Sequence, residues 1–254
     1  MGGLSVTERP PLGDGPARGV VVVLVHGSMD RSSSFRRVMT RLPEATVISF
    51  DRRGYASSVE TRPSDVFDDQ VGDLVEVLAG RSAVAVGHSF GGDVVLATCQ
   101  RHPGLIEAAM VYEPPQPWLN TRPAASAGSL ALAHAGEDPA EAAEIFTRRM
   151  IGDARWERLP ETVRQKRRAE GAALVADLTS LRTAPPPFDP SAISAPVVCG
   201  YGTHSKDHHR HDTRTLASQL STGELHAIPG CGHGAHLSHP NEFAALIRNA
   251  IDRR

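Results

Sequence analysis

The sequence predicts an α/β protein in which helices flank a mostly parallel sheet. Short runs of apolar, β-branched residues alternate with helical patterns, and short links join them, as in right-handed βαβ units. The chain has 254 residues and 40% of them are hydrophobic, which is enough for one sizeable core. The alternation stops between residues 114 and 190 and then resumes, so one long insertion between two strands is expected.

Four strands are expected in the first part of the chain. The run VVVVLV at 20–25 has no polar alternation, which is typical of a strand buried on both faces. Similar runs predict strands at 45–50, 82–87 and 105–113, and the segments between them predict helices at 33–42, 66–80 and 91–102. In the second of these helices Val71, Leu74 and Leu78 recur at helical spacing, which places them on one face.

Residues 114–190 predict a helical insertion, because they are rich in Ala, Glu and Arg and contain no strand pattern. Two proline-rich segments bracket them, PPQPW at 114–118 and APPPFDP at 184–190. The insertion would divide a core made of residues 1–113 and 191–254. After it, strands are expected at 195–202 and 223–230, and helices at 212–220 and 239–254.

Charge and composition exclude several classes of function. A net charge of -2 gives no reason to expect nucleic acid or an anionic membrane as a partner. The N-terminal segment lacks the apolar core of a secretory signal, and the longest apolar run is too short to span a bilayer. The three cysteines are far apart and fit a reducing compartment; they are Cys99, Cys199 and Cys231. A cytoplasmic protein that acts on a small molecule is therefore expected, and its oligomeric state is left open.

The stretch GHSFG at 87–91 follows the third expected strand and precedes a helix. It fits the pattern G-x-S-x-G, in which a serine stands at a sharp strand-to-helix corner and glycines allow close backbone approach. Such a corner lifts the hydroxyl above the carboxyl edge of the sheet, beside helix amides that attract negative charge. Ser89 is therefore the candidate nucleophile, and a simple helix cap is the alternative.

A serine hydroxyl needs a general base, normally a histidine, to act as a nucleophile at neutral pH. Three histidines compete after the last expected strand, namely His233, His236 and His239. His233 follows two glycines and so lies on a flexible loop that can reach over the sheet edge, whereas His239 precedes a proline at the start of a helix. His233 is the favoured base, and His236 is intermediate.

Four motifs in this order make the sequence similar to the α/β-hydrolase fold family over nearly its whole length. They are LVHGSMD after the first clear strand, SFDRRGYASS after the second, GHSFGG at the corner and IPGCGHGAHLSHP near the end. The resemblance implies the chain order serine, acid, histidine, and it implies that the insertion at 114–190 is a helical lid. It also implies an oxyanion hole made by the main-chain amides of Phe90 and Ser28, with Met29 as another possible donor. His26 is expected to brace the loop before Ser28.

The acid of the triad departs from the family pattern. The family usually places it just past the glycine that ends the PVVCG strand, where this sequence has Gly202 and Thr203. Neither residue can orient a histidine. Glu113, at the end of the strand before the insertion, is the preferred replacement because that end shares the sheet edge with Ser89. Asp207 is the alternative, although an aspartate just before a helix is also a common N-cap, and the chain could lack a catalytic acid.

The segment 204–212 contains four histidines and two aspartates, so a metal site has to be considered. It has no compact ligand pattern such as H-E-x-x-H, and neither a metal nor a cofactor is expected. Four aromatic residues of the insertion are candidates for the substrate pocket, although each is more typical of a core; they are Trp118, Phe146, Trp156 and Phe188.

These observations lead to a functional hypothesis. The chain is expected to be a serine hydrolase that cleaves an ester, thioester or lactone of a small molecule through an acyl-enzyme on Ser89. His233 would act as the base, Glu113 would orient it, and the amides of Ser28 and Phe90 would bind the oxyanion. The alternatives are a ligand-binding member of the fold without hydrolytic activity, and a C–C hydrolase, lyase or cyclase that uses the same pocket.

Overall fold

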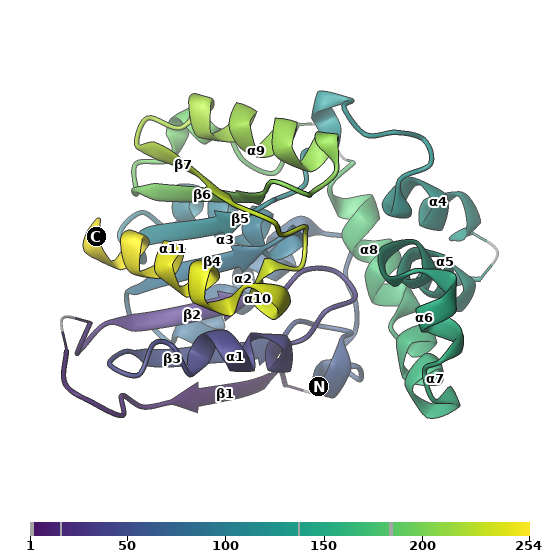
Figure 1. Ribbon diagram of the computed structural model, residues 1–254, viewed down its shortest axis with the longest axis horizontal. Helices are drawn as coiled ribbons and strands as arrows, with labels where there is room; N and C mark the ends of the chain where they lie inside the picture. The colour runs from purple at the N-terminus through teal and green to yellow at the C-terminus, as the bar shows by residue number, and fades with distance from the viewer. Residues whose placement is uncertain (1–2, 16, 137, 183–184) are drawn as a thin grey trace.

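The computed structural model describes residues 3–15, 17–136, 138–182 and 185–254, and a seven-stranded sheet forms its centre (Figure 1). The strand order is β1-β3-β2-β4-β5-β6-β7; β1 is antiparallel to β3 and every other neighbouring pair is parallel. The strands are β1 Ser5–Arg9, β2 Val21–Val25, β3 Thr46–Asp51, β4 Ala83–His88, β5 Ile106–Tyr112, β6 Val197–Gly202 and β7 Gly223–Ile228.

Helices cover both faces of the sheet, so apolar residues from both sides of the central strands are buried. One face carries α2 Phe67–Leu78, α3 Phe90–Arg101 and α9 Asp207–Gln219, and the other carries α1 Arg36–Met39, α10 Ala235–Ser238 and α11 Pro240–Asp252. Short 3-10 turns lie at Ser32–Phe35, Ala56–Ser58, Pro117–Leu119 and Pro190–Ala192. This double burial explains why the parallel strands have continuous apolar runs.

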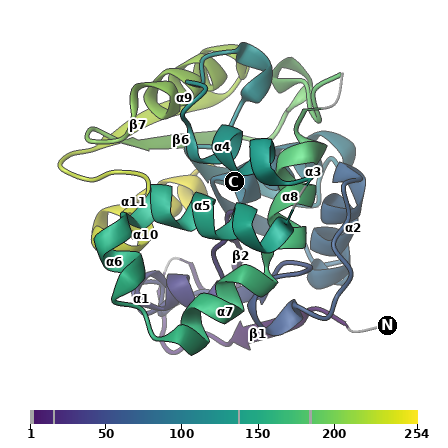
Figure 2. The same ribbon diagram turned by 90° about the vertical axis from the view of Figure 1, so that its right-hand side faces the viewer.

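The segment between β5 and β6 forms five helices that lie together beyond one end of the sheet (Figures 1 and 2). They are α4 Ala127–His134, α5 Pro139–Ile151, α6 Asp153–Glu157, α7 Glu161–Ala169 and α8 Gly171–Ser180. No described residue between 114 and 190 belongs to a strand. These helices share a small apolar cluster with Met29 and Tyr55 of the core, which holds them against the loops that follow β2 and β3.

Three elements differ from the sequence prediction, the first being the helix expected at 33–42, which is a 3-10 turn at Ser32–Phe35 followed by the short α1. Strand β1 was not predicted, because it is an exposed edge strand with no apolar face: even Val6 is 47% exposed. The strand forms by backbone pairing with β3, from Ser5 opposite Asp51 to Arg9 opposite Val47. No local sequence pattern indicates this pairing. Helix α9 begins at Asp207 rather than at 212, so part of the histidine-rich segment is helical. Within the described residues, no helix has the length and apolarity that crossing a membrane requires.

Candidate active site

Ser89 stands at the corner between β4 and α3, in a backbone conformation that non-glycine residues rarely adopt. Its φ is 52° and its ψ is -129°. Such a conformation costs roughly 1–3 kcal/mol and persists only where the surroundings enforce it. Here the Ser89 amide donates to the Tyr112 carbonyl at 2.9 Å, and the Ser89 carbonyl accepts from the Gly92 amide at 2.7 Å. The corner is thus fixed from the neighbouring strand and from its own helix.

Two glycines let the backbone approach this corner closely. A Cβ atom on Gly91 would lie 2.3 Å from the Val25 carbonyl oxygen, and one on Gly27 would lie 2.8 Å from the Ser89 Cβ. Side chains at these positions would therefore push α3 away from β2 and the following loop away from Ser89. These close contacts explain why the sequence has glycine at both positions.

His233 and Glu113 form a hydrogen-bonded pair beside Ser89. The Nδ1 atom of His233 lies 2.6 Å from Oε2 of Glu113, whose side chain is fully buried, and His233 lines the same cavity as Ser89. A carboxylate on Nδ1 fixes the imidazole tautomer with its Nε2 lone pair free. Among the described residues no hydrogen bond joins Ser89 Oγ to His233. Such bonds often tighten only in the substrate complex.

Glu113 contacts the residues after β6 where the family usually places its acid. Its Oε1 atom accepts a hydrogen bond from the Gly202 amide at 2.8 Å and another from the Ser205 hydroxyl at 2.5 Å. A Cβ atom on Gly202 would lie 2.3 Å from the Cys231 carbonyl oxygen, so no side chain fits there. The residue at the family's usual acid position therefore contributes its amide to an acid that comes from the neighbouring strand.

The alternative residues have other partners, although His236 lines the adjoining cavity with Ser89 and His233. Asp207 is the first residue of α9, its side chain is 92% exposed and it pairs with Arg210. His236 is buried and lies 3.1 Å from the Asp30 carboxylate. His239 precedes α11, and its Nδ1 is 2.8 Å from the Ser238 hydroxyl. The structure therefore brings His233 and Glu113 together and leaves these three apart from that pair.

Three residues that the sequence analysis did not single out support the His233 loop. The Nε2 of His88 donates to the His233 carbonyl at 2.8 Å, and the Tyr112 hydroxyl donates to the Gly232 carbonyl at 3.0 Å. The ring of His209 stacks on that of His233, with centroids 4.3 Å apart. Each of the three comes from a different element. Only His88, which stands next to Ser89 in the sequence, could have been predicted to lie near the site.

The imidazoles around His233 are kept neutral. Burial, reinforced by neighbouring imidazoles, holds the pKa of His88 well below its usual range, and burial does the same for the pKa of His209. Burial and the nearby Arg122 charge lower the pKa of His208 to about 4. Positive charges next to the base would oppose its protonation during the reaction, so their neutrality favours a working base.

The proposed oxyanion donors face the same cavity. Ser28 and Phe90 both line it, and neither main-chain amide donates to another residue within the described part of the chain. Phe90 is the first residue of α3, so its amide is one of the unpaired donors of a helix N-terminus. Met29 lines only the adjoining cavity. The Ser28 and Phe90 amides are thus both unpaired among the described residues and belong to residues that line the cavity with Ser89.

The loop that carries Ser28 is held in place by His26 and by a residue of the insertion. His26 is fully buried; its Nδ1 donates to the Gly27 carbonyl at 2.7 Å and its Nε2 accepts from the Arg52 amide at 2.9 Å. Burial and the Arg52 charge lower the pKa of His26 to about 4, so it stays neutral. The Ser28 hydroxyl donates at 2.7 Å to Asp177 on α8. His26 thus has the bracing position expected of it.

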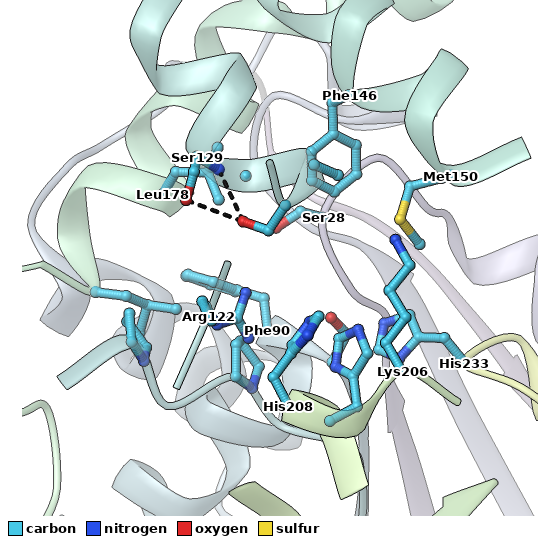
Figure 3. A pocket seen from close by; sticks show the side chains of 18 of the residues that line it. Ser28, Phe90, Arg122, Ser129, Phe146, Met150, Leu178, Lys206, His208 and His233 are labelled. Atoms are coloured by element: carbon cyan, nitrogen blue, oxygen red, sulfur yellow. Dashed lines mark hydrogen bonds between the residues drawn. The ribbon is translucent and has the colours of Figure 1, made fainter. Parts of the chain in front are cut away.

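A cavity that is partly open to solvent surrounds Ser89 and His233. Figure 3 shows Ser129, Phe146, Met150 and Leu178, from the helices of the insertion, on one side of it, and Arg122, His208, Lys206 and His233 on the other. Of the four aromatic candidates only Phe146 lines it; Trp156 is fully buried, and Trp118 packs edge-on against Phe188. A second cavity adjoins it and shares Ser28, Ser89, Phe146, Met150 and His233.

Two groups of side chains in the described part of the chain bring possible metal-ligand atoms within 4.8 Å of one another. They are Asp30, His88 and His236, and Glu113, His209 and His233. Each contains a carboxylate already in contact with an imidazole. Of the histidine-rich segment only His209 takes part. The three cysteines are buried and free.

Comparison with known proteins gives related results at three levels. The model described as the Alpha/beta hydrolase family matches residues 22–246. The chain is 28% identical to a 2-succinyl-6-hydroxy-2,4-cyclohexadiene-1-carboxylate synthase of Serratia proteamaculans, over 91% of this chain and 92% of that protein. It is 27% identical to a pimeloyl-[acyl-carrier protein] methyl ester esterase of Yersinia enterocolitica, over 89% and 91%. A thermophilic esterase from Thermogutta terrifontis shares the fold, with a TM-score of 0.75, 19% identity and coverage of 98% and 93%.

Proposed function

The chain belongs to the alpha/beta hydrolase family and is an enzyme of hydrolase type, and we propose that it cleaves a small-molecule ester, thioester or lactone through an acyl-enzyme on Ser89. One observation carries the proposal. A buried carboxylate holds His233 at 2.6 Å in the cavity that also contains a serine in a strained corner conformation. A serine that served only as a helix cap would need neither partner.

The reaction would proceed in two balanced halves. Ser89 Oγ attacks the carbonyl carbon as His233 Nε2 removes its proton, and the amides of Ser28 and Phe90 bind the oxyanion. The C–O or C–S bond then breaks, and His233 returns the proton to the leaving group. Water attacks the acyl-enzyme with His233 again as base, which releases the acid and restores Ser89. Glu113 orients the imidazole and stabilises the imidazolium.

The relatives support ester chemistry and also a second candidate. One relative that aligns over most of the chain is a methyl ester esterase by name, which fits the proposal. Another is a synthase by name, which favours a lyase or related reaction in the same pocket as the alternative. The insertion at 114–190 would act as the lid of this pocket, since its helices provide one wall.

The proposal is tested by labelling with a fluorophosphonate and by turnover of p-nitrophenyl esters. Wild-type protein should be labelled at Ser89, and Ser89→Ala should lower kcat/KM by roughly 10⁴-fold or more while the melting temperature changes little. Ser218→Ala, on the outer side of α9, is the matched control and should behave as wild type. Wild-type protein that neither reacts with the fluorophosphonate nor turns over esters would exclude serine hydrolysis.

A further inference from the structure

The cavity around Ser89 has an unbalanced charge. Its lining contains three permanent cations, Arg122, Arg182 and Lys206, and no described carboxylate. None of the three side chains forms an ion pair with a described residue. Arginines outside the cavity behave differently: Arg148 and Arg168, for example, each contact two or more carboxylates on the insertion. The three cations of the cavity therefore have no counter-charge paired with them among the described residues.

Arg122 carries the strongest signal. Its Nε and Nη2 atoms are buried, and they have no hydrogen-bond partner in the described part of the chain. A buried donor without an acceptor costs free energy, and the cost is larger when the group is charged. Burial accordingly lowers the pKa of Arg122 despite the charges of Asp212 and Asp93 nearby. A folded protein holds such a group most readily where a ligand supplies the acceptor.

The two nearby acids do not supply it. Neither Asp212 nor Asp93 forms an ion pair with Arg122 among the described residues. Asp212 instead accepts a hydrogen bond from the Thr121 hydroxyl at 2.6 Å, and burial raises its pKa. Burial also raises the pKa of Asp93 well above its usual range. Neither carboxyl group thus supplies an acceptor for the buried Nε and Nη2 atoms of Arg122.

We propose that Arg122 binds a carboxylate of the substrate. The substrate of the enzyme would then be an ester that also has a free carboxylate group. This inference rests on the proposed function of Ser89. The planar guanidinium fork matches a carboxylate and can bind it through two parallel hydrogen bonds. Lys206 and Arg182 add longer-range attraction from the rim. The imidazoles of His208 and His209 stay neutral near pH 7, so they add no charge.

Two probes that differ only in charge test the proposal: mono-p-nitrophenyl adipate, which has a free carboxylate, and its methyl ester. Wild type should prefer the free carboxylate by roughly 10- to 100-fold in kcat/KM, the range expected for a charge-assisted pair. Arg122→Met should bring the ratio close to one, mainly by slowing the anionic probe. Arg122→Lys, which keeps the charge without the fork, should give an intermediate ratio.

A matched control removes a positive charge elsewhere. Arg81 is exposed, pairs with Glu8 and lies just before β4, so Arg81→Gln should keep the wild-type ratio. If wild type hydrolyses both probes through Ser89 without preference, or if Arg122→Met keeps the preference, the carboxylate proposal is wrong and the serine mechanism stands.

A binding measurement decides the matter if neither probe is hydrolysed, an outcome that would count against the proposed function instead. In the Ser89→Ala background, calorimetry compares monomethyl adipate with dimethyl adipate. Tighter binding of the monoester that disappears with Arg122→Met would support the carboxylate site. Equal affinities would overturn it. Melting curves of each variant show whether it is folded.

Discussion

Glu113 uses both of its carboxylate oxygens, and each has a different task. Oε1 accepts hydrogen bonds from the Gly202 amide and the Ser205 hydroxyl, and Oε2 faces Nδ1 of His233. The first two bonds fix the rotation of the carboxylate, so the third can fix the rotation of the imidazole. The Glu113 backbone is also held at a positive φ of 50°, a strain that the surroundings must enforce.

Replacing Glu113 with Gln should separate geometry from charge. The Gln oxygen can keep the bonds to Gly202 and Ser205, but its NH₂ group would then face His233 Nδ1. The imidazole would place its proton on Nε2 and lose its function as a base, so kcat should fall by roughly 10³- to 10⁴-fold. Stopped-flow acylation with a p-nitrophenyl ester and a melting curve measure the two effects.

Asp207→Asn is the matched control for this experiment. Asp207 is exposed and pairs only with Arg210, so activity should be unchanged and the free energy of unfolding should change by less than about 1 kcal/mol. If the Asp207 variant lost activity and the Glu113 variant kept it, the acid would have been misidentified.

At this scale the sequence could predict residues whose signal is local. Ser89, His233 and Glu113 each follow a strand at the carboxyl edge, and the structure brings them to one cavity or into contact. The support from Ser205 and Tyr112 could not be predicted, because it depends on residues 92 and 120 positions away in the chain. Such contacts exist only once the sheet has formed.

Among the elements, helix α8 of the insertion is joined to the core through one buried carboxylate. Asp177 of this helix accepts two hydrogen bonds from Arg52, at 3.0 and 2.7 Å, and one each from Tyr55 and Ser28 at 2.7 Å. The Arg52 and Asp177 side chains are both fully buried. One carboxylate thus joins the insertion to the loop after β3 and to the loop of the expected oxyanion hole.

Asp177→Asn should therefore destabilise the protein strongly. It leaves the Arg52 guanidinium buried without its counter-charge, and breaking such a pair typically costs about 3–5 kcal/mol. Urea unfolding measures the change. Asp69→Asn is the control, because Asp69 is half-exposed and 3.5 Å from Arg53, so its loss should cost less than about 1 kcal/mol. Equal effects of the two substitutions would contradict this account of α8.

The elements that the sequence predicted correctly are those with a burial pattern. Strands β2 to β6 and the helices that pack on them carry apolar residues at the period of their structure, since they are buried on one or both faces, whereas only Ile228 of the edge strand β7 is buried. The edge strand β1 has no such pattern, and the start of α9 is polar because its first turns contain charged and histidine residues. Both depend on pairing and packing that a local window does not contain.

For the molecule as a whole, buried neutral histidines link stability to pH. Burial and the Arg52 charge lower the pKa of His26 from 6.5 to about 4. Burial shifts the pKa values of His88 and His209 in the same direction. The unfolded chain takes up these protons near pH 6.5 and the folded protein does not, so acid favours unfolding.

The free energy of unfolding should consequently be constant above about pH 7 and should fall as the pH drops toward 4, with roughly 3 kcal/mol of the loss due to His26 alone. Urea unfolding across this range measures the total, and NMR titration of the His26 ring identifies its share. A ring that titrates near pH 6.5 in the folded protein, or stability that stays flat down to pH 4, would disprove the linkage.

The position of Glu113 has a consequence for how such a protein can change. Tyr112, which precedes the acid, pairs in register with His88, which precedes the serine, so one backbone pairing supports both groups. The loop after β6 supplies only the Gly202 amide and the Ser205 hydroxyl. Apart from His209, which stacks on His233, residues 206–211 can therefore diverge without moving the proposed triad, and Lys206 and His208 among them line the cavity. Substitutions in this segment, in evolution or in a designed library, can therefore change the substrate preference while the residues proposed for catalysis keep their positions.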